Sequence, residues 1–166
     1  SFGSTRNWVK RIKAVLSDGN EYEFKPLTAL ELGEKKNLSG FEGEIYRRMH
    51  ELLEKNYDLI KGAKPKVSKN SAGYALWNVW DRTTFDLTKL FVGSEGTLSI
   101  FTEIEFALIK PKQHRKLVII FLPDLSKLSE IVAQMLTHKP ETFESYDDHT
   151  FQFAIRFFPD IVKSLK

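Results

Sequence analysis

A glycine-flanked turn holds the residues of this chain best suited to binding a ligand through the backbone. In the segment FVGSEGTL, residues 91–98, Gly93 and Gly96 bracket Ser94 and Glu95 just before a predicted strand. Glycine lets a backbone approach a ligand closely and adopt conformations that other residues avoid, and successive amide donors in such a turn can hold an anion. A purely structural turn fits the same residues. The spacing is not GxGxxG and the segment opens a strand, so anion binding at a helix N-terminus does not apply.

A second candidate segment is KNSAGY at residues 69–74, which combines small residues with Gly73 and the aromatic Tyr74. Small residues leave room for a ligand, and an aromatic ring can lie against one. The same composition also fits a surface turn in which Tyr74 is a partly buried anchor. The segment by itself does not decide between these two interpretations.

No other residues have the spacing of a catalytic or metal-binding site. The consecutive residues Asp147, Asp148 and His149 cannot easily converge on one ion, so we expect them in a solvated turn or at a helix start. No serine has identifiable His and Asp partners, and there is no Walker loop. The histidines lack metal-ligand spacing; they are His50, His114, His138 and His149. We therefore predict no catalytic residue and no metal site in this chain.

The composition excludes several classes of function. The chain has no cysteine, which rules out disulfides and thiolate metal sites and fits a reducing, cytoplasmic location. Its net charge is only +3, and basic residues alternate with acidic ones, which argues against a nucleic-acid surface. No apolar run approaches the ~20 residues of a membrane helix. The start SFGS, without Met, reads as folded sequence and predicts a piece of a longer protein.

Hydrophobic periodicity predicts the elements that position the two candidate segments. Alternation on both sides of an Asp-Gly pair predicts a hairpin over residues 8–25. Residues 27–38 suggest a short helix broken at Gly33. Helical spacing predicts a longer helix over residues 40–61, started by a capping box of Ser39 and Glu42 and ended by a left-handed Gly62.

The second half of the chain has a different pattern. Alternation predicts a strand over residues 97–109, with Ile100 and Ile104 on one face. The apolar run KLVIIFL, a helical stripe and the segment ETFESY then predict a strand–helix–strand unit from about residue 116, followed by a helix over 148–166 that Pro159 interrupts. Between the two halves, residues 64–92 look irregular, and their aromatic side chains are expected to cover either the core or a planar ligand.

Three segments, in order, resemble one known family. The sequence DLTKLFVGSEGTLSIFTEIEFALIKP, residues 86–111, resembles the end of the FAD-binding domain of the FAD-linked oxidases, which are vanillyl-alcohol-oxidase (PCMH-type) flavoproteins. The nearest branch is that of the glycolate oxidase flavin subunit and the D-lactate dehydrogenases. FGSTRNWVKRIKAVLSDG, residues 2–19, resembles the family segment that follows its central flavin loop, and KNSAGY resembles its Asn/Thr-Gly-Tyr segment.

The resemblance implies an α+β fold in two parts. Residues 1–112 would be the C-terminal half of a PCMH-type FAD-binding domain, which is a mixed, mainly antiparallel sheet with flanking helices. Residues 113–166 would begin the ferredoxin-like C-terminal substrate domain, with FESYDD in the place of its second strand. The stretch at residues 75–85 is longer and richer in Trp than in the shorter family members.

The resemblance also implies that FAD lies against the turn. Carried over position by position, the cofactor-binding residues are Gly93, Ser94, Glu95, Gly96, Thr97, Leu98 and Ser99, with Gly73 and Tyr74 as further candidates. The family usually has glycine at the position of Ser99, which argues against a very close backbone approach there.

The implied function is a part of an FAD-dependent oxidoreductase that acts on CH–OH groups, of the D-lactate or glycolate 2-hydroxy-acid dehydrogenase type. A small 2-hydroxy acid and an electron acceptor would be its partners. The family's pyrophosphate loop and metal ligands lie outside the matched motifs. We therefore expect this chain alone to be inactive, to bind FAD weakly or not at all, and to expose an interface capable of self-association. Two alternatives stay open: an enzyme of the alkyl-glycerone-phosphate synthase or aldonolactone oxidase type, and a non-catalytic interaction module with an aromatic interface.

Overall fold

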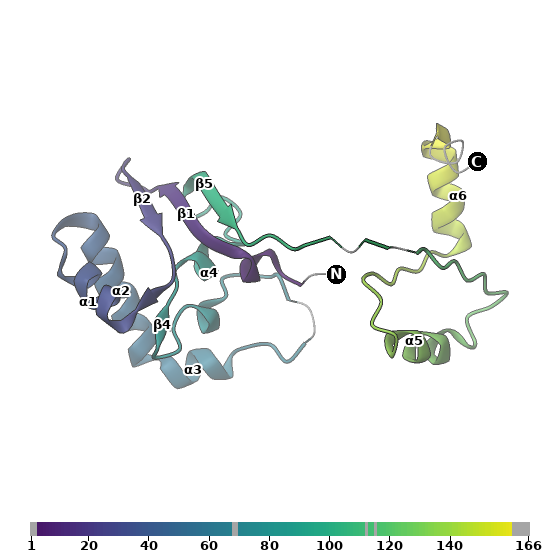
Figure 1. Ribbon diagram of the computed structural model, residues 1–166, viewed down its shortest axis with the longest axis horizontal. Coiled ribbons are helices and arrows are strands. Elements are labelled where there is room, and N and C mark those ends of the chain that lie inside the picture. Colours follow the sequence, from purple (N-terminus) through teal and green to yellow (C-terminus); the bar gives the residue numbers. More distant parts are fainter. Residues whose placement is uncertain (1–2, 68–69, 112, 115, 161–166) are drawn as a thin grey trace. The chain divides into compact units, whose positions relative to one another are not determined.

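The computed structural model describes residues 3–67, 70–111, 113–114 and 116–160. Residues 3–113 form one compact unit, and the described residues from 114 onward belong to a second (Figure 1). The elements of the first unit are η1 (Thr5–Asn7), β1 (Val9–Val15), β2 (Glu21–Phe24), β3 (Leu27–Thr28), α1 (Ala29–Asn37), α2 (Gly40–Lys55), α3 (Tyr57–Gly62), η2 (Leu76–Asn78), β4 (Thr84–Phe85), α4 (Thr88–Phe91) and β5 (Ile100–Phe106). The second unit contains α5 (Leu128–Leu136) and α6 (Asp148–Phe157). The α+β class is therefore confirmed.

An antiparallel sheet in the order β2-β1-β5 organises the first unit (Figure 1). The predicted hairpin is confirmed, because β1 and β2 pair directly and Gly19 has the positive φ, 81°, that its turn requires. On the inner face of the sheet, Ile12, Ala14 and Phe24 are all fully buried. A second, two-stranded sheet pairs β3 with β4.

The prediction of which residues of the last strand face the core is only partly correct, because β5 contains a bulge. Lys13 pairs with Glu103, whereas the next residue, Ala14, pairs with Phe101, so one extra residue of β5 is inserted between them. Residues directly opposite each other in an antiparallel pair lie on the same face. Phe101, and not Ile100 as the alternating pattern predicted, therefore shares the inner face.

Charged side chains cover the outer face of the sheet. Arg11 lies between three carboxylates, contacting Glu23 at 2.8 Å, Glu105 at 3.2 Å and Glu103. Lys13 contacts Glu103 at 3.0 Å. These hydrogen bonds, the first of them to Glu23, raise the pKa of Arg11. The pairs are exposed and contribute little to stability individually, but they identify this face as the one that meets water.

The helix predicted over residues 40–61 is two helices with different caps. Helix α2 ends at Asn56, whose side-chain amide donates to the carbonyl of Leu52 at 2.9 Å, and α3 follows. The predicted capping box is wrong, because Ser39 makes no side-chain cap and Glu42 pairs with Lys35 instead. Gly62 is not a left-handed stop, since its φ is not positive.

The capping box lies instead at the start of α1. There the Thr28 side chain accepts from the Glu31 amide at 3.3 Å, and Glu31 accepts from the Thr28 amide at 2.8 Å. The helix continues through Gly33, so the predicted break is wrong as well.

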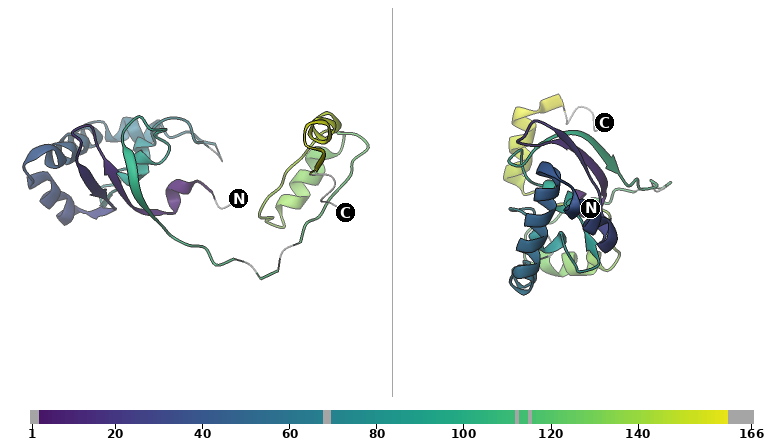
Figure 2. Two further views of the ribbon diagram at one scale, coloured as in Figure 1. Left: turned by 90° about the horizontal axis from the view of Figure 1, so that it is seen from above. Right: turned by 90° about the vertical axis from the view of Figure 1, so that its left-hand side faces the viewer.

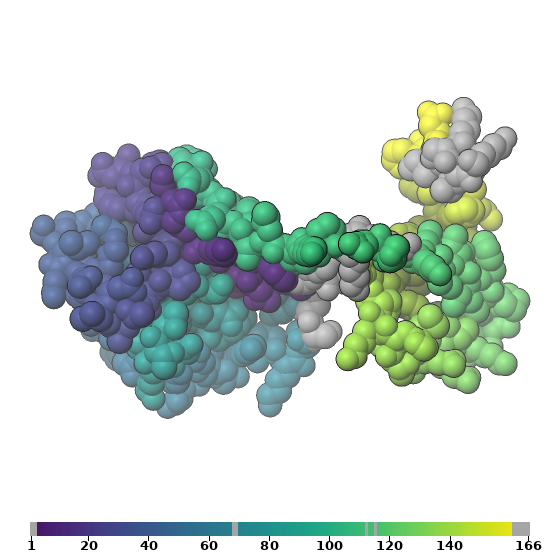
Figure 3. All heavy atoms as spheres, viewed as in Figure 1, coloured from purple at the N-terminus to yellow at the C-terminus, as the bar shows by residue number. Residues whose placement is uncertain are grey.

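An aromatic core joins the sheet, α2 and the segment that leads to the candidate turn. The ring of Phe24 lies 6.4 Å from that of Tyr46 on α2 and 4.6 Å from that of Phe91 on α4. Both helices therefore pack on the inner face of the sheet (Figure 2). Phe85 completes the core against Tyr46, with a ring separation of 5.9 Å. In the space-filling view, the elements of this unit form a closely packed body (Figure 3).

The irregular aromatic stretch between α3 and α4 mainly covers the unit's own core. Trp80 is buried, and its indole nitrogen donates to Glu54 of α2 at 2.7 Å. Arg82 donates to the same carboxylate at 3.1 Å and lies over the Tyr57 ring. The hydrogen bond from Trp80, followed by that from Arg82, holds the pKa of Glu54 below its ordinary value. Of the two alternatives for these aromatic residues, core covering accounts for Trp80 and Phe85.

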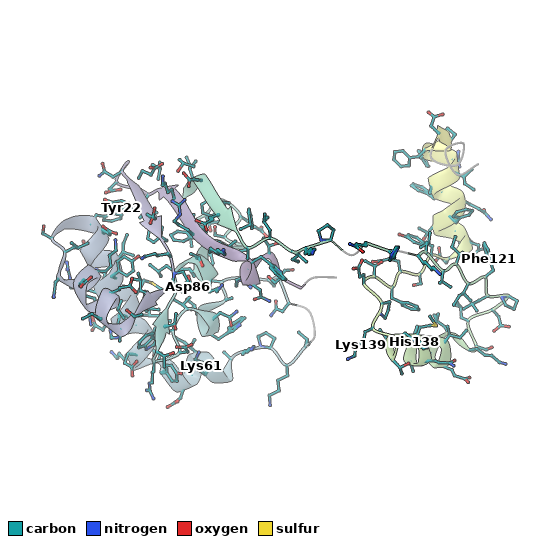
Figure 4. All side chains as sticks on the ribbon, viewed as in Figure 1. Tyr22, Lys61, Asp86, Phe121, His138 and Lys139 are labelled. Carbon is teal, nitrogen blue, oxygen red and sulfur yellow. The ribbon has the colours of Figure 1, made fainter. Side chains whose placement is uncertain are left out.

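The second unit lacks the predicted strand–helix–strand arrangement. Helices α5 and α6 form, and Asp147 caps α6 by accepting from the Thr150 amide at 2.6 Å. The runs KLVIIFL and ETFESY are not strands (Figure 1). Phe121, labelled in Figure 4, is 90% exposed. A strand is stabilised by the hydrogen-bond ladder to a partner, and no partner strand occurs among the described residues of this unit.

Candidate functional site

The predicted ligand-binding turn comes directly after α4. Phe91, the last residue of α4, packs in the core and thereby fixes the start of the turn. Gly93, Glu95 and Gly96 have φ angles of 90°, 52° and 78°. Three left-handed residues within four positions bend the backbone sharply, and glycine supplies two of them without steric cost. The amide of Thr97 closes the bend by donating to the carbonyl of Ser94 at 3.0 Å.

This turn leaves donors available for a ligand. Within the part of the chain that the structure describes, the amides of Gly93, Glu95 and Gly96 have no hydrogen-bond partner, and all three residues are exposed. Ser94 is only 3% exposed, and its Oγ has no partner among the described residues. Buried hydroxyls without a partner are uncommon, and neighbouring left-handed amides form anion-binding concavities. The turn is therefore suited to a polar, anionic ligand group.

The second candidate segment lies against the first. The Tyr74 hydroxyl is 2.7 Å from Thr97 Oγ1, which is 2.5 Å from the carbonyl of Ser94. Because the single hydroxyl proton of Thr97 is donated to Ser94, Tyr74 must be the donor in the first contact. Gly73, with a φ of 65°, makes the bend that precedes Tyr74. The structure thus brings together two segments that the sequence separates by about twenty residues.

A buried arginine supports the turn from the N-terminal segment. The Arg6 guanidinium donates through Nε to the carbonyl of Lys89 at 2.9 Å and through Nη2 to the carbonyl of Val92 at 2.7 Å. Lys89 in return donates from Nζ to the carbonyl of Arg6 at 2.7 Å and lies 3.4 Å from Asp86. Asp86, labelled in Figure 4, is itself buried and accepts from the Thr88 amide and hydroxyl. Burial lowers the pKa of Arg6 below its ordinary value.

An apolar groove of about 280 Å³ begins where the turn ends. Leu98 contributes to it from the turn, Leu90 from α4, and Phe41 and Met49 from α2. Arg48 is the cationic residue in its lining. The turn therefore lies at the surface beside a concave apolar wall, an arrangement suited to a ligand that has both a charged and a planar apolar part.

The nine predicted site residues thus form one region, and two of them have features that the sequence did not reveal. The hydroxyls of Ser94 and Ser99 are both buried without a partner among the described residues. Lys69, which begins the second segment, lies outside the described residues. Arg6 and Lys89 were not predicted, because no local pattern shows that residues 83 positions apart will meet. Cofactor binding by the nine residues stays a prediction.

Neither a metal centre nor a membrane span is found in the described ranges. No group of three or more His, Asp or Glu side chains there is arranged to hold a metal ion. None of the described helices combines the length and hydrophobicity that crossing a membrane requires.

Alanine at Gly93 is expected to lower the free energy of unfolding by about 2 kcal/mol, and alanine at Gly96 by about 1 kcal/mol. Both glycines have positive φ, but a Cβ at position 93 would also lie 3.1 Å from Arg6 Nη2, whereas one at position 96 meets nothing within 4 Å. Urea unfolding of the two variants measures the difference. Equal losses of unfolding free energy in the two variants would show that Arg6 does not restrict the space at position 93.

Comparison with known proteins identifies relatives over most of the chain. The D-2-hydroxyglutarate dehydrogenase of Pseudomonas putida is 25% identical over 157 residues, 94% of this chain and 16% of that protein. That of Escherichia coli is 33% identical over 120 residues, 70% of this chain and 12% of that protein. The glycolate oxidase subunit GlcD of Bacillus subtilis is 32% identical over 102 residues, 60% of this chain and 19% of that protein.

The chain thus spans less than a fifth of the length of each of these relatives. No family model matches it, and no solved structure gives a significant match. The relatives agree with the family that the three ordered motifs resemble. The homologues of this chain are therefore FAD-linked oxidases, namely D-2-hydroxyglutarate dehydrogenases, a glycolate oxidase subunit and a D-lactate dehydrogenase.

Proposed function

We propose that this chain supplies one wall of the FAD site in a D-2-hydroxy-acid dehydrogenase. The observation that carries the proposal is the turn at residues 93–97, with its three exposed amides and the buried hydroxyl of Ser94. The family of the relatives points to FAD as the ligand, and the names of the relatives favour 2-hydroxy acids such as D-2-hydroxyglutarate, glycolate or D-lactate over the substrates of the two other flavoenzyme types.

The residues of the turn fit such a cofactor in two ways. FAD carries a pyrophosphate, and backbone amides with positive φ are suited to its oxygens. FAD also carries flat ring systems, and the apolar groove beside Leu98 offers a surface for one of them. The buried Ser94 hydroxyl gains a hydrogen-bond partner if a ligand oxygen or nitrogen reaches it, which removes the cost of leaving it unpaired.

The role of these residues is to bind and orient. When bound, FAD supplies the redox chemistry by accepting a hydride equivalent from the hydroxyl-bearing carbon of the substrate. Gly93, Glu95 and Gly96 donate their amides, and the hydrogen bonds from the Tyr74 hydroxyl to the Thr97 hydroxyl and from there to the carbonyl of Ser94 hold the bend in one conformation. We assign no proton-transfer residue to this chain.

The two compact units support a corresponding division into domains. We propose that residues 1–112 form the C-terminal half of the PCMH-type FAD-binding domain and that residues 113–166 begin the C-terminal substrate domain. The apolar run at residues 117–121 is exposed, which fits a segment that pairs with other parts of a longer polypeptide. The same surface would favour self-association of the isolated chain. A cytoplasmic location remains our expectation from the absence of cysteine.

Titration of the isotope-labelled chain with FAD tests the proposal. We expect weak binding, with a Kd of about 1 mM or about −4 kcal/mol, because the chain represents only a part of its relatives. The amides of Gly93, Glu95 and Gly96 should show the largest changes in NMR chemical shift, followed by those of Gly73 and Tyr74.

Gly93→Ala is the matched control, because it distorts the turn and leaves the groove intact. It should reduce the shift changes at the turn and leave those at Leu90 and Leu98 less affected. Unchanged turn amides at saturating FAD would refute the proposed function. Tight, stoichiometric binding would instead contradict our expectation that the chain alone binds FAD weakly.

A further inference from the structure

The positive charge of Arg6 is buried without a carboxylate partner. The residue is 7% exposed, and the hydrogen bonds of its guanidinium go to neutral carbonyl groups, those of Lys89 and Val92. Among the described residues, no Asp or Glu oxygen lies within 4.0 Å of its guanidinium. A buried charge that is hydrogen-bonded but unpaired favours an anion nearby.

The charged side chains near Arg6 do not neutralise its positive charge. Lys89 adds a second cation, since its Nζ lies 2.7 Å from the carbonyl of Arg6. Within the described ranges, Asp86 is the one carboxylate in contact with this pair, at 3.4 Å from Lys89. Glu95 brings a further negative charge within the turn, but its side chain is exposed to water, where its field is strongly screened. The segment behind the turn therefore carries more positive than negative charge.

The guanidinium packs directly on the backbone of the turn. A Cβ built on Gly93 would lie 3.1 Å from Nη2 of Arg6, and the carbonyl that Nη2 contacts belongs to the preceding residue, Val92. The amides of Gly93, Glu95 and Gly96, which have no partner in the described part of the chain, are on the same short bend. An anion held by these amides would thus sit close to a desolvated cation, where electrostatic interactions are stronger than in water.

We propose that Arg6 is a positioning residue that fixes the turn at residues 93–97 and gives it a preference for ligands that carry phosphate. This inference rests on the proposed function and deepens it, because it gives this turn a contact with the charged part of the cofactor, in addition to the contact made by the family's pyrophosphate loop, which lies outside the matched motifs. Arg6 acts through the backbone and through its field, and it does not itself contact the ligand. The reciprocal contacts of Arg6 and Lys89 also make the N-terminal segment a part of the site.

The test compares a charged and a neutral probe in the whole 166-residue chain. ADP and adenosine differ only in the pyrophosphate, and NMR titration gives the Kd of each. We expect the wild-type chain to bind ADP at least tenfold more tightly than adenosine, with shift changes at Gly93, Glu95 and Gly96. Arg6→Gln should weaken ADP binding about tenfold and leave adenosine unchanged, because it removes the charge.

Two further variants separate charge from packing. Arg6→Lys keeps the charge but has a single nitrogen in place of the two that donate to the carbonyl groups, so it should speed hydrogen exchange in the turn and still prefer ADP over adenosine. Arg11→Gln removes a surface arginine on the outer face of the sheet and should change neither affinity. If Arg6→Gln fails to fold, the Arg6→Lys variant tests the proposal by itself. A folded Arg6→Lys that prefers ADP over adenosine supports the proposal, and a folded Arg6→Lys without that preference overturns it.

Different experimental results would refute this inference and the proposed function. A folded Arg6→Gln that binds ADP as tightly as the wild type overturns the role of Arg6, while FAD still shifts the turn amides. A wild-type chain whose turn amides respond to neither FAD nor ADP overturns both. Equal weakening of ADP and adenosine by Arg6→Gln would show a purely structural role and would also refute the phosphate preference.

Discussion

Replacing Gly43 by alanine is expected to lower the free energy of unfolding by about 3 kcal/mol or more. A Cβ at this position would lie 1.9 Å from the carbonyl oxygen of Leu38 and 2.8 Å from Nη1 of Arg47. The oxygen belongs to the backbone that joins α1 to α2, so no side-chain rotation can relieve the overlap. The connection has to move, and Arg47 would lose the hydrogen bond that it donates to Leu38 at 2.8 Å.

Gly33→Ala is the matched control for this substitution. Gly33 also lies inside a helix, α1, but a Cβ there meets nothing within 4 Å. Alanine should therefore increase the free energy of unfolding by about 0.5–1 kcal/mol, which is the ordinary difference in helix propensity. Thermal and urea unfolding of the two variants measure effects of opposite sign. If both variants were stabilised, α1 and α2 would not be packed as closely as the structure has them.

Phe85→Ala should cost about 4 kcal/mol of stability, since truncation of a buried Phe removes its transfer free energy and leaves a cavity. Phe85 is fully buried, and its ring lies 5.9 Å from those of both Tyr46 and Trp80. It connects α2 with the segment that leads into the turn. We therefore expect a fall in the melting temperature of about 20 °C and faster hydrogen exchange in the turn.

The control for Phe85 is Phe106, an aromatic residue at the end of β5 that is 43% exposed. Phe106→Ala removes the same atoms and should cost about 1 kcal/mol, because most of the lost surface is already in water. Differential scanning calorimetry of both variants gives the comparison. Equal losses would mean that β5 is covered in solution, and a small loss at Phe85 would mean that the aromatic core is not formed.

The sequence predicted what depends on short-range patterns. Alternation around Asp18-Gly19 correctly gave the hairpin, and glycine spacing correctly located the sharp turn at Gly93 and Gly96. The contact of Tyr74 with Thr97 was not predicted, because the family resemblance implied only that both residues line the cofactor. Its geometry depends on how the chain folds over 23 residues, which periodicity does not encode.

Other features differ from the predictions because the residues form a competing interaction instead. The apolar stripe runs on past Asn56, yet the side chain of Asn56 binds a helix carbonyl and ends α2. Ser39 and Glu42 match a capping box, but Lys35 pairs with Glu42. No local pattern singles out Arg6, because its burial depends on contacts with residues more than eighty positions away. The predicted strands of the second unit need partners that its described residues do not provide.

The bulge in β5 determines how the chain tolerates insertions and deletions. Thr102 is the extra residue between two paired positions, so the bulge keeps Phe101 opposite Ala14 although one more residue separates Phe101 from Glu103 than in a regular strand. Point substitutions at Thr102 should thus be mild. Removing the residue would close the bulge and leave Glu103 opposite Lys13 and Phe101 opposite Ala14 in a regular ladder, so the preceding bend and its donors would stay on the same side of the sheet.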